Sequence, residues 1–492
     1  MSLFKDAAKG MVWTTASTVV RSVVALLQVA FLTRFLEKSD FGVVAIATLF
    51  IGFTQLFMDL GISAGIMHKQ DTTPQQYSSL FWLNIIMGIV LTTILCVSSP
   101  LIAKAYKEPQ LVKVISLLSL TVFFSSLGSQ HKTVQQKKMR FKYISIVEIV
   151  SSLLSLGIAI YLAMNSFGVY SLVFANLFHA AFAGLLFLGI GLSRDRNISF
   201  HFKLSETYEY LKIGVYSIGS NILDYFSREL DIMIISATLG KEIVGVYSLC
   251  KRLVMSVYGA INPIFTKVFT PILALIQSEK QRVQKLYNDI VQSLGLLNMP
   301  IYCLIAIFSM GILNFLYGEQ YQDGALVLAF LSLTYGVNTT GNPVGSLQVA
   351  MGRTDLGLYW TMVRIVATVL AIYLGTLFGG VDGIAFSLLL LSCFVNPLFW
   401  IISIRPITKG EYIDYFASSL LVCLEVMVYS IPFFILFRNI SLVWACLLIG
   451  FVYICIYAIL ISRLYSKSYL VRTLRDVLIP GLISEVHFKR HA

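Results

Sequence analysis

The sequence predicts an all-α polytopic membrane protein with about fourteen transmembrane helices. The composition is 57% hydrophobic and 13% charged, the mean hydropathy is +0.80, and long apolar stretches recur along the chain. A soluble domain carries roughly 25% charged residues, so this chain must use lipid as its solvent. No separate polar block is long enough for a sizeable soluble domain.

Apolar stretches of about 20 residues, the length needed to cross a bilayer, follow one another with short connections. The expected spans are 11–35, 41–66, 78–103, 111–131, 143–163, 169–192, 212–238, 243–266, 287–316, 325–351, 356–378, 381–404, 416–437 and 441–463. Very short turns near 36–40, 239–242 and 379–382 predict that the flanking helices form hairpins.

The cations of the connections predict that both termini are cytoplasmic, because cytoplasmic loops are enriched in Lys and Arg. With the N-terminus inside, the outer connections hold only Lys38, Lys104, Lys107, Lys113, Lys241 and Arg438. Most of the 37 Lys and Arg residues then lie in inner segments. The net charge of +12 is therefore mostly a topology signal and requires no nucleic-acid partner.

The sequence is duplicated at an offset of 203 residues, as between Lys9 and Lys212. LEKSDFGV from Leu36 aligns without a gap with LGKEIVGV from Leu239. Such repeats are typical of transporters in which one repeat rocks against another. An offset that contains about six helices, an even number, gives both copies one orientation and relates them by a pseudo-two-fold axis along the membrane normal.

The duplication predicts two lobes of about six helices each, residues 1–200 and 201–405. Two extra helices follow in 406–463, and a basic cytoplasmic tail in 464–492. Apolar residues at helical spacing predict a cytoplasmic amphipathic linker near 266–286, within the second lobe.

Polar residues at equivalent positions of two helices predict a central hydrophilic cavity. One face of the first helix carries Thr14, Ser17, Thr18, Arg21 and Gln28. The equivalent face of the seventh helix carries Ser217, Ser220, Asn221, Asp224, Arg228 and Asp231. We expect the two faces to meet across the axis. Arg21 aligns with Asp224, and a gate between these two residues is a hypothesis.

Charges inside apolar spans are the candidate site residues, because an ionised side chain exposed to lipid costs several kcal/mol. The candidate substrate-binding cations are Arg21, Arg228, Lys251, Arg252 and Arg364. Arg suits phosphate because its fork donates two parallel hydrogen bonds. The candidate ion-coupling or gating acids are Glu148, Asp224, Glu229 and Asp231.

Local pairing is an alternative for some of these charges. Asp224 and Arg228 are four residues apart on one helix and can neutralise each other. Arg21 and Arg252 have no acid within four residues, and Lys251 is the charged neighbour of Arg252. Their anionic partner is either an acid of another helix, Glu148 or Asp224, or an anionic substrate.

Other motifs favour structural roles. His179 lies deep in a span, where a hydrogen-bonded structural role is favoured over a proton relay. The dipeptides Asn262-Pro263, Asn342-Pro343 and Asn396-Pro397 predict kinks or breaks. The seven cysteines form no CxxC pair and are expected to be free thiols. No nucleotide-binding loop, metal-ligand cluster or catalytic triad occurs, so we expect no cofactor, no metal and no enzymatic activity.

Several stretches resemble the polysaccharide-exporting flippases of the multidrug/oligosaccharidyl-lipid/polysaccharide superfamily. They are residues 13–50, AYKEP at 105–109, PILALIQ at 271–277, and NPVGS at 342–346 followed by GRTD at 352–355. The resemblance covers nearly the whole chain and is to the branch that contains the colanic acid and teichuronic acid exporters.

This resemblance implies a V-shaped bundle of two lobes plus two extra helices in a bacterial cytoplasmic (inner) membrane. It implies flipping of undecaprenyl-diphosphate-linked oligosaccharide units by alternating access, for lipopolysaccharide, capsule or exopolysaccharide biosynthesis. The partners would be this lipid-linked oligosaccharide, membrane lipids, a polysaccharide polymerase and a chain-length regulator. Related flippases place cations of the first and eighth helices in the cavity, and Arg21 and Arg252 match by helix and depth.

Two other functions fit the sequence less well. A multidrug/cation antiporter of the same fold should have a cavity that is acidic or apolar, whereas the expected cavity here is rich in cations. A membrane enzyme such as a polysaccharide polymerase or ligase needs a large outer loop, and the longest outer connection expected is 318–324.

Overall fold

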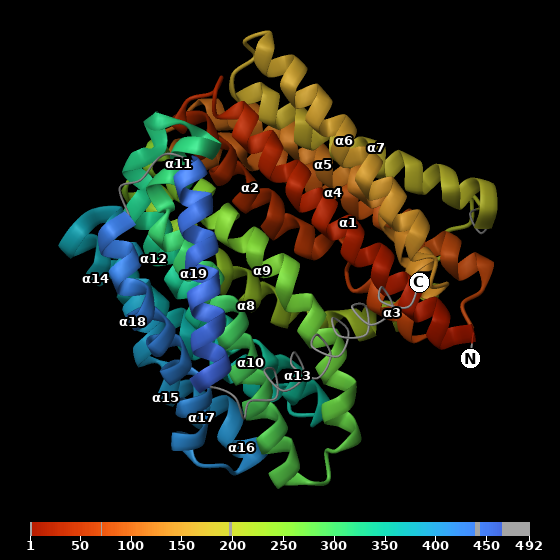
Figure 1. The fold of residues 1–492 in the computed structure, drawn as a ribbon. Helices are drawn as coiled ribbons and strands as arrows, with labels where there is room; N and C mark the ends of the chain where they lie inside the picture. The colour runs from red at the N-terminus through yellow and green to blue at the C-terminus, as the bar shows by residue number, and fades with distance from the viewer. Residues whose placement is uncertain (1, 70, 196–198, 438–442, 465–492) are drawn as a thin grey trace, which may run out of the picture. The chain divides into compact units, whose positions relative to one another are not determined.

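The regular structure of the chain is helical (Figure 1). The computed structural model describes residues 2–69, 71–195, 199–437 and 443–464, and no strand occurs in these ranges. Ten helices within them are long and apolar enough to cross a membrane. The expected all-α, multi-pass membrane protein is thereby confirmed.

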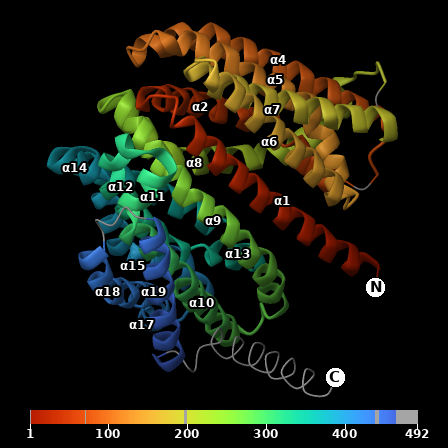
Figure 2. The ribbon, with the colours of Figure 1, turned by 45° about the horizontal axis from the view of Figure 1, so that its top comes forward.

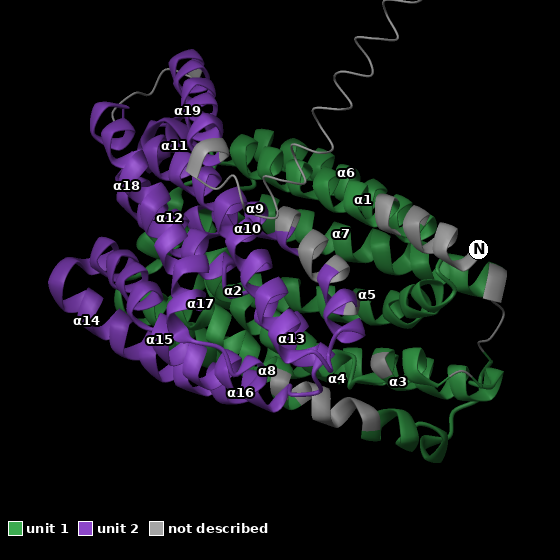
Figure 3. Cartoon of the chain, turned by 60° about the horizontal axis from the view of Figure 1, so that its bottom comes forward, with its two compact units in different colours: residues 1–249 green, residues 250–492 purple. Residues whose placement is uncertain are grey.

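The chain divides into two compact units, residues 1–249 and 250–492 (Figure 3). The first unit contains α1 (Ser2–Leu32), α2 (Lys38–Met58), α3 (Ile62–His68), α4 (Pro74–Ala105), α5 (Gln110–Lys137), α6 (Phe141–Met164), α7 (Val169–Ile190), a π-helical turn (Gly191–Asp195), a 3-10 turn (Leu204–Glu206) and α8 (Tyr208–Thr238). Helix α9 (Lys241–Leu275) begins in the first unit and ends in the second.

The second unit continues with α10 (Lys280–Ile307), α11 (Ser309–Tyr317), a 3-10 turn (Glu319–Gly324), α12 (Ala325–Thr339), α13 (Pro343–Ala350), α14 (Asp355–Phe394), α15 (Asn396–Phe399), a π-helical turn (Trp400–Ile404), α16 (Arg405–Thr408), α17 (Tyr412–Ser418), α18 (Leu420–Phe437) and α19 (Val443–Leu464). The division into lobes at residues 200 and 405 stays a prediction, and the basic tail after residue 464 lies outside the described residues.

Close helix packing builds the first unit. Helices α4, α5 and α7 lie side by side, α6 packs on α7, and α1 runs along α6 (Figure 2). Glycines allow α5 and α7 to approach, because a Cβ on Gly184 would lie 2.1 Å from the backbone oxygen of Phe124. The position of α1 is therefore set by α6, which in turn is held by the stacked helices behind it.

The duplicated turns contact each other reciprocally. A Cβ on Gly42 would lie 1.8 Å from the backbone oxygen of Lys241, and a Cβ on Gly245 would lie 2.0 Å from the backbone oxygen of Lys38. Gly42 and Gly245, like Lys38 and Lys241, are related by the 203-residue offset. The repeat seen in the sequence therefore corresponds to a two-fold-like contact between α2 and the start of α9. The Lys241 ammonium also pairs with Glu108 at 2.7 Å.

The short turns predicted from the sequence are present. Five residues separate α1 from α2, counted from Thr33 to Glu37, and two separate α8 from α9. Helix α14 is broken at Gly379 and Gly380, where Gly380 has φ +55°, a conformation that glycine adopts readily. The chain reverses there, and a Cβ on Gly375 would lie 2.6 Å from the backbone oxygen of Gly383. The predicted hairpin near 379–382 is confirmed.

The Asn-Pro dipeptides differ in their effects. The predicted span 325–351 is divided into α12 and α13, with Asn342 preceding the first residue of α13. Asn396-Pro397 opens α15 after α14 has ended. In contrast, α9 continues through Asn262-Pro263, so no break occurs there. Proline is tolerated in the first turn of a helix, where its missing N–H needs no partner.

Two apolar clusters hold the second unit together. One joins α10 with α14–α17 and includes Tyr287, Phe399 and Tyr415, and the other joins α10 with α18 and α19. The segment near 266–286, expected as an amphipathic linker, consists of the end of α9, a turn and the start of α10. Within it Leu273 is buried and Leu275 is exposed.

Candidate anion-binding site

The polar face of α1 directs one charged group toward its neighbours. The hydroxyl of Thr14 donates to the backbone oxygen of Gly10 at 2.8 Å, and that of Thr18 donates to Thr14 at 2.8 Å. These hydroxyls are satisfied within their own helix, as is common for Ser and Thr in helix interiors. Arg21 of the same face reaches another helix.

Arg21 forms an ion pair with Glu148 of α6. The guanidinium donates to Oε2 of Glu148, while Nζ of Lys132, from α5, donates to Oε1 at 2.5 Å. The three side chains come from three helices of the first unit, and only 13% of the Glu148 side chain is exposed, against 42% for Arg21 and 38% for Lys132. One carboxylate between two cations leaves the cluster with a net positive charge.

Independent contacts fix α1 over α6 around this cluster. The Ser145 hydroxyl donates to the backbone oxygen of Trp13 at 3.0 Å, and Nζ of Lys142 lies 5.6 Å from the centroid of the Trp13 ring. A Cβ on Gly10 would lie 2.5 Å from the ring of Phe141. Arg21 is therefore held opposite Glu148 by packing as well as by charge.

His179 of α7 completes the surroundings of the cluster. Its Nε2 lies 3.4 Å from the hydroxyl of Ser152, which donates to the backbone oxygen of Glu148 at 2.8 Å. His179 is also within electrostatic range of Arg21, Glu148 and Lys132. The predicted structural role of His179 stays a prediction, and Ser152 provides the hydrogen-bonding neighbour that such a role requires.

The acidic face of α8 is paired locally. Oδ2 of Asp224 accepts from Arg228 at 2.6 Å, so the pairing expected from the sequence is confirmed. Oδ2 of Asp231 accepts from the hydroxyl of Tyr247, a buried residue of α9, at 2.7 Å. Glu229 lies between them on the same helix. Arg21 and Asp224, the two sides of the hypothesised gate, thus have different partners in this structure.

The candidate cations of the second unit have different environments. Lys251 is 2% exposed, whereas Arg252, the next residue of α9, is exposed. Neighbouring residues of a helix point about 100° apart, which accounts for the different burial of these two side chains. Arg364 is half-buried on α14. The binding roles of these three residues stay predictions.

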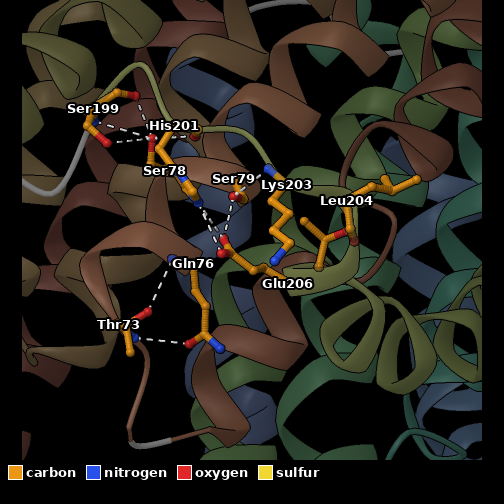
Figure 4. A network of polar contacts seen from close by, with 10 residues as sticks. Thr73, Gln76, Ser78, Ser79, Ser199, His201, Lys203, Leu204 and Glu206 are labelled. Atoms are coloured by element: carbon orange, nitrogen blue, oxygen red, sulfur yellow. Dashed lines mark hydrogen bonds and ion pairs between the residues drawn. The ribbon is translucent and has the colours of Figure 1, made fainter.

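A second polar network lies where the segment 199–206 docks on α4 (Figure 4). The Ser78 hydroxyl donates to the backbone oxygen of Ser199 at 2.5 Å, and the Ser79 hydroxyl donates to Glu206 at 2.7 Å. Nε2 of His201 lies 3.0 Å from the same carboxylate. These hydrogen bonds, from Ser79 first and then His201, lower the pKa of Glu206 below its ordinary value.

Sequence reasoning missed Lys132 because the expected span ended at residue 131 and placed this residue in an inner connection. Helix α5 continues to Lys137, so Lys132 stands on a transmembrane helix. Buried polar residues on either side, Gln130, His131 and Thr133, are the signal that the helix stays packed beyond the apolar stretch.

Comparison with known proteins places the chain among polysaccharide biosynthesis proteins. The family described as "Polysaccharide biosynthesis protein" matches residues 31–326. The chain belongs to this polysaccharide biosynthesis family. The resemblance drawn from the sequence is thereby confirmed.

Two relatives within the curated proteins align over most of the chain. Teichuronic acid biosynthesis protein TuaB of Bacillus subtilis is 27% identical over 362 residues, covering 73% of this chain and 74% of TuaB. Lipopolysaccharide biosynthesis protein WzxC of Escherichia coli is 25% identical over 418 residues, covering 85% of each chain. The alignments with these two relatives thus cover more residues than the segment 31–326 that the family matches.

Solved structures of two transporters share the fold of this family member. The lipid II flippase MurJ in an inward closed conformation aligns with a TM-score of 0.72 and 14% identity, over 93% of this chain and 99% of MurJ. The Vibrio cholerae MATE transporter VcmN aligns with a TM-score of 0.57 and 14% identity, over 85% of this chain and all of VcmN. Identities this low establish the fold alone.

Proposed function

We propose that this protein flips undecaprenyl-diphosphate-linked oligosaccharide repeat units across a bacterial cytoplasmic membrane, for the biosynthesis of a surface polysaccharide. The observation that carries the proposal is the net positive cluster of Arg21, Lys132 and Glu148 inside the helices of a polysaccharide biosynthesis protein. Membrane-embedded charges are expensive and mark substrate or ion pathways. A diphosphate is the anion that such a cargo brings into the membrane.

Arg21 and Lys132 have complementary properties for this cargo. The planar guanidinium can donate two parallel hydrogen bonds to phosphate oxygens, and the ammonium acts as a compact point charge. Both side chains keep more than a third of their surface exposed, so they can contact a second anion beside Glu148. The polyprenyl tail would remain in lipid because each buried CH₂ favours the apolar phase by about 0.8 kcal/mol.

The proposed topology has about fourteen transmembrane helices with both termini in the cytoplasm. Two lobes of one orientation would rock to expose the cargo to either side of the membrane in turn. Arg228, Lys251, Arg252 and Arg364 are proposed as further cargo contacts, and Asp224, Glu229 and Asp231 as ion-coupling groups. A polysaccharide polymerase and a chain-length regulator are proposed as partners.

A multidrug/cation antiporter is the second candidate, supported by the fold shared with VcmN. Cationic drugs require acidic or apolar surroundings, whereas the cluster around Arg21 is positive. The charge of this cluster therefore favours an anionic cargo. Flipping moves the cargo without making or breaking a covalent bond, which agrees with a transporter rather than an enzyme.

The test is deletion of the gene in its host, followed by complementation. We expect deletion to accumulate the lipid-linked repeat unit and to lower surface polysaccharide. Arg21→Ala should restore less than about a tenth of the polysaccharide, since losing a charge-assisted hydrogen bond of about 1.5–3 kcal/mol weakens binding about tenfold or more. Arg21→Lys should restore an intermediate amount, because it keeps the charge without the fork.

The matched control is Lys104→Ala, which removes an exposed cation at the end of α4. It should restore normal polysaccharide at the same protein level. Normal polysaccharide with Arg21→Ala as well would contradict the cation site, and deletion without any lipid-linked intermediate would contradict the flippase function.

A further inference from the structure

We infer that Glu148 is an internal counter-anion, which competes with a phosphate or diphosphate group for Arg21 and Lys132. The inference rests on the proposed function, because it names the residue that tunes binding and release of the cargo at the same site. It concerns phosphate chemistry in general, so a free diphosphate and a lipid-linked diphosphate are both ligands to be compared.

The geometry of Glu148 imitates a bridging phosphate. Its two oxygens are divided between two cations from different helices, Oε2 toward Arg21 and Oε1 toward Lys132. A phosphate offers the same feature, oxygens that diverge from one centre and accept from Arg and Lys together. Any anion that binds these cations must therefore share or replace the hydrogen bonds that Glu148 now accepts.

The Glu148 side chain is less exposed than the two cations for which it would compete with phosphate. Glu148 is largely covered by protein, with 13% of its side chain exposed, while Arg21 and Lys132 keep 42% and 38%. The two cationic side chains thus keep accessible surface that a second anion can approach. The carboxylate lies behind them, where it can hold them in position until a stronger anion arrives.

Charge balance gives the competition a direction. Two cations and one carboxylate leave an excess positive charge, which a divalent anion neutralises better than the carboxylate alone. Glu148 then limits the affinity of the site for phosphate, because its negative charge lies close to the incoming phosphate and repels it. A site that must release its cargo on the other side of the membrane benefits from such a limit.

A purely structural ion triad that ties α1, α5 and α6 together predicts something different. In that case, replacing Glu148 loosens α1 and weakens every property of the site. The contacts of Ser145 with Trp13, and of Gly10 with Phe141, hold α1 on α6 without Glu148. Glu148→Gln, which keeps the shape and an acceptor oxygen, should therefore fold and isolate the effect of the charge.

The experiment measures binding of inorganic pyrophosphate to the full-length protein in nanodiscs by titration calorimetry. We expect Glu148→Gln to bind at least about tenfold more tightly than the natural protein, a change of about 1.4 kcal/mol. Arg21→Ala and Lys132→Ala should each bind more weakly, and Glu148→Gln combined with Arg21→Ala should lose the gain. Lys104→Ala should match the natural protein.

A second arm replaces pyrophosphate with undecaprenyl diphosphate in the nanodisc, detected by native mass spectrometry. A gain with both ligands supports recognition of the diphosphate itself. Unchanged or weaker binding of both ligands by Glu148→Gln, in a protein with normal thermal stability, overturns the inference. A gain restricted to the lipid also overturns it, because the competition concerns phosphate oxygens that both ligands share.

Measuring surface polysaccharide and the lipid-linked unit in cells distinguishes failure of this inference from failure of the proposed function. If Arg21→Ala abolishes polysaccharide while Glu148→Gln leaves pyrophosphate binding unchanged, the flippase function stands and the counter-anion role fails. If Glu148→Gln tightens pyrophosphate binding but deletion of the gene accumulates no lipid-linked unit, the anion site stands and the flippase function fails.

Discussion

Arg21 and Asp224 occupy equivalent positions of the duplicated sequence, but they pair with Glu148 and Arg228 respectively. Arg21 reaches a largely covered carboxylate on another helix, whereas Asp224 meets an exposed neighbour on its own helix. The two copies therefore share a position and differ in how their charges are compensated. The difference has measurable consequences for the stability of each pair.

Asp224→Asn should change the free energy of unfolding by less than about 0.5 kcal/mol, because an exposed i,i+4 pair contributes little. Thermal unfolding in detergent checks this expectation. Arg228→Gln serves as the reciprocal variant and should behave alike. A drop of more than a few degrees in either variant would show that the pair supports packing beyond the helix surface.

Gly42→Ala should destabilise the protein by about 1–3 kcal/mol, because overpacking forces the backbone to move. The added Cβ would lie 1.8 Å from the backbone oxygen of Lys241, so α2 and α9 must separate. Gly157→Ala is the matched control, since a Cβ there meets nothing within 4 Å. It should stabilise α6 slightly, as alanine favours helices over glycine by about 1 kcal/mol.

Thermal unfolding of the two variants in the same detergent provides the measurement. Gly245→Ala, the repeat-related position, should resemble Gly42→Ala because its Cβ would lie 2.0 Å from the backbone oxygen of Lys38. If Gly42→Ala and Gly157→Ala unfold at the same temperature, the close contact of the two turns is contradicted.

Docking of the segment 199–206 on α4 should weaken as the pH falls below about 4.5, the ordinary pKa of a Glu side chain. Hydrogen bonds from Ser79 and His201 lower the pKa of Glu206 in the docked segment. Because the pKa of Glu206 is lower in the docked segment, its ionised carboxylate stabilises docking at pH values above the pKa that Glu206 has when the segment is undocked. This stabilisation is lost as the pH falls through the pKa that Glu206 has in the docked segment.

Hydrogen exchange at the Lys203 amide, corrected for its intrinsic pH dependence, reports on this docking because that amide donates to Ser79 at 3.0 Å. Protection should be constant above pH 5 and decline below about 4.5. Glu206→Gln cannot ionise and should show no decline over the same range. An equal decline in both proteins would assign the effect to other groups.

Much of this architecture follows from hydropathy and spacing, because spans and tight turns are local properties. The break at Gly379 and the Asp224–Arg228 pair involve neighbours in sequence and were predicted. For Arg21 the sequence left Glu148 among several alternatives. Their 127-residue separation means that only the packing of α1 on α6 decides between them.

Other parts of the site depend on helix ends and side-chain directions that composition does not reveal. Lys132 belongs to the site because α5 continues past the apolar stretch, to Lys137. Lys251 and Arg252 are neighbouring candidate cations in the sequence, and only the structure shows that the first is buried and the second exposed, because successive helical residues point apart.

The reciprocal contact of Gly42 and Gly245 has the form of an isologous dimer interface, in which one patch meets its own copy. Two identical chains could form this contact from a single sequence, with each glycine facing the backbone of the other chain. Joining the copies in one gene preserves that interface while freeing each half to mutate alone. A charge at position 21 can then become the opposite charge at 224, a difference that no symmetric homodimer could carry.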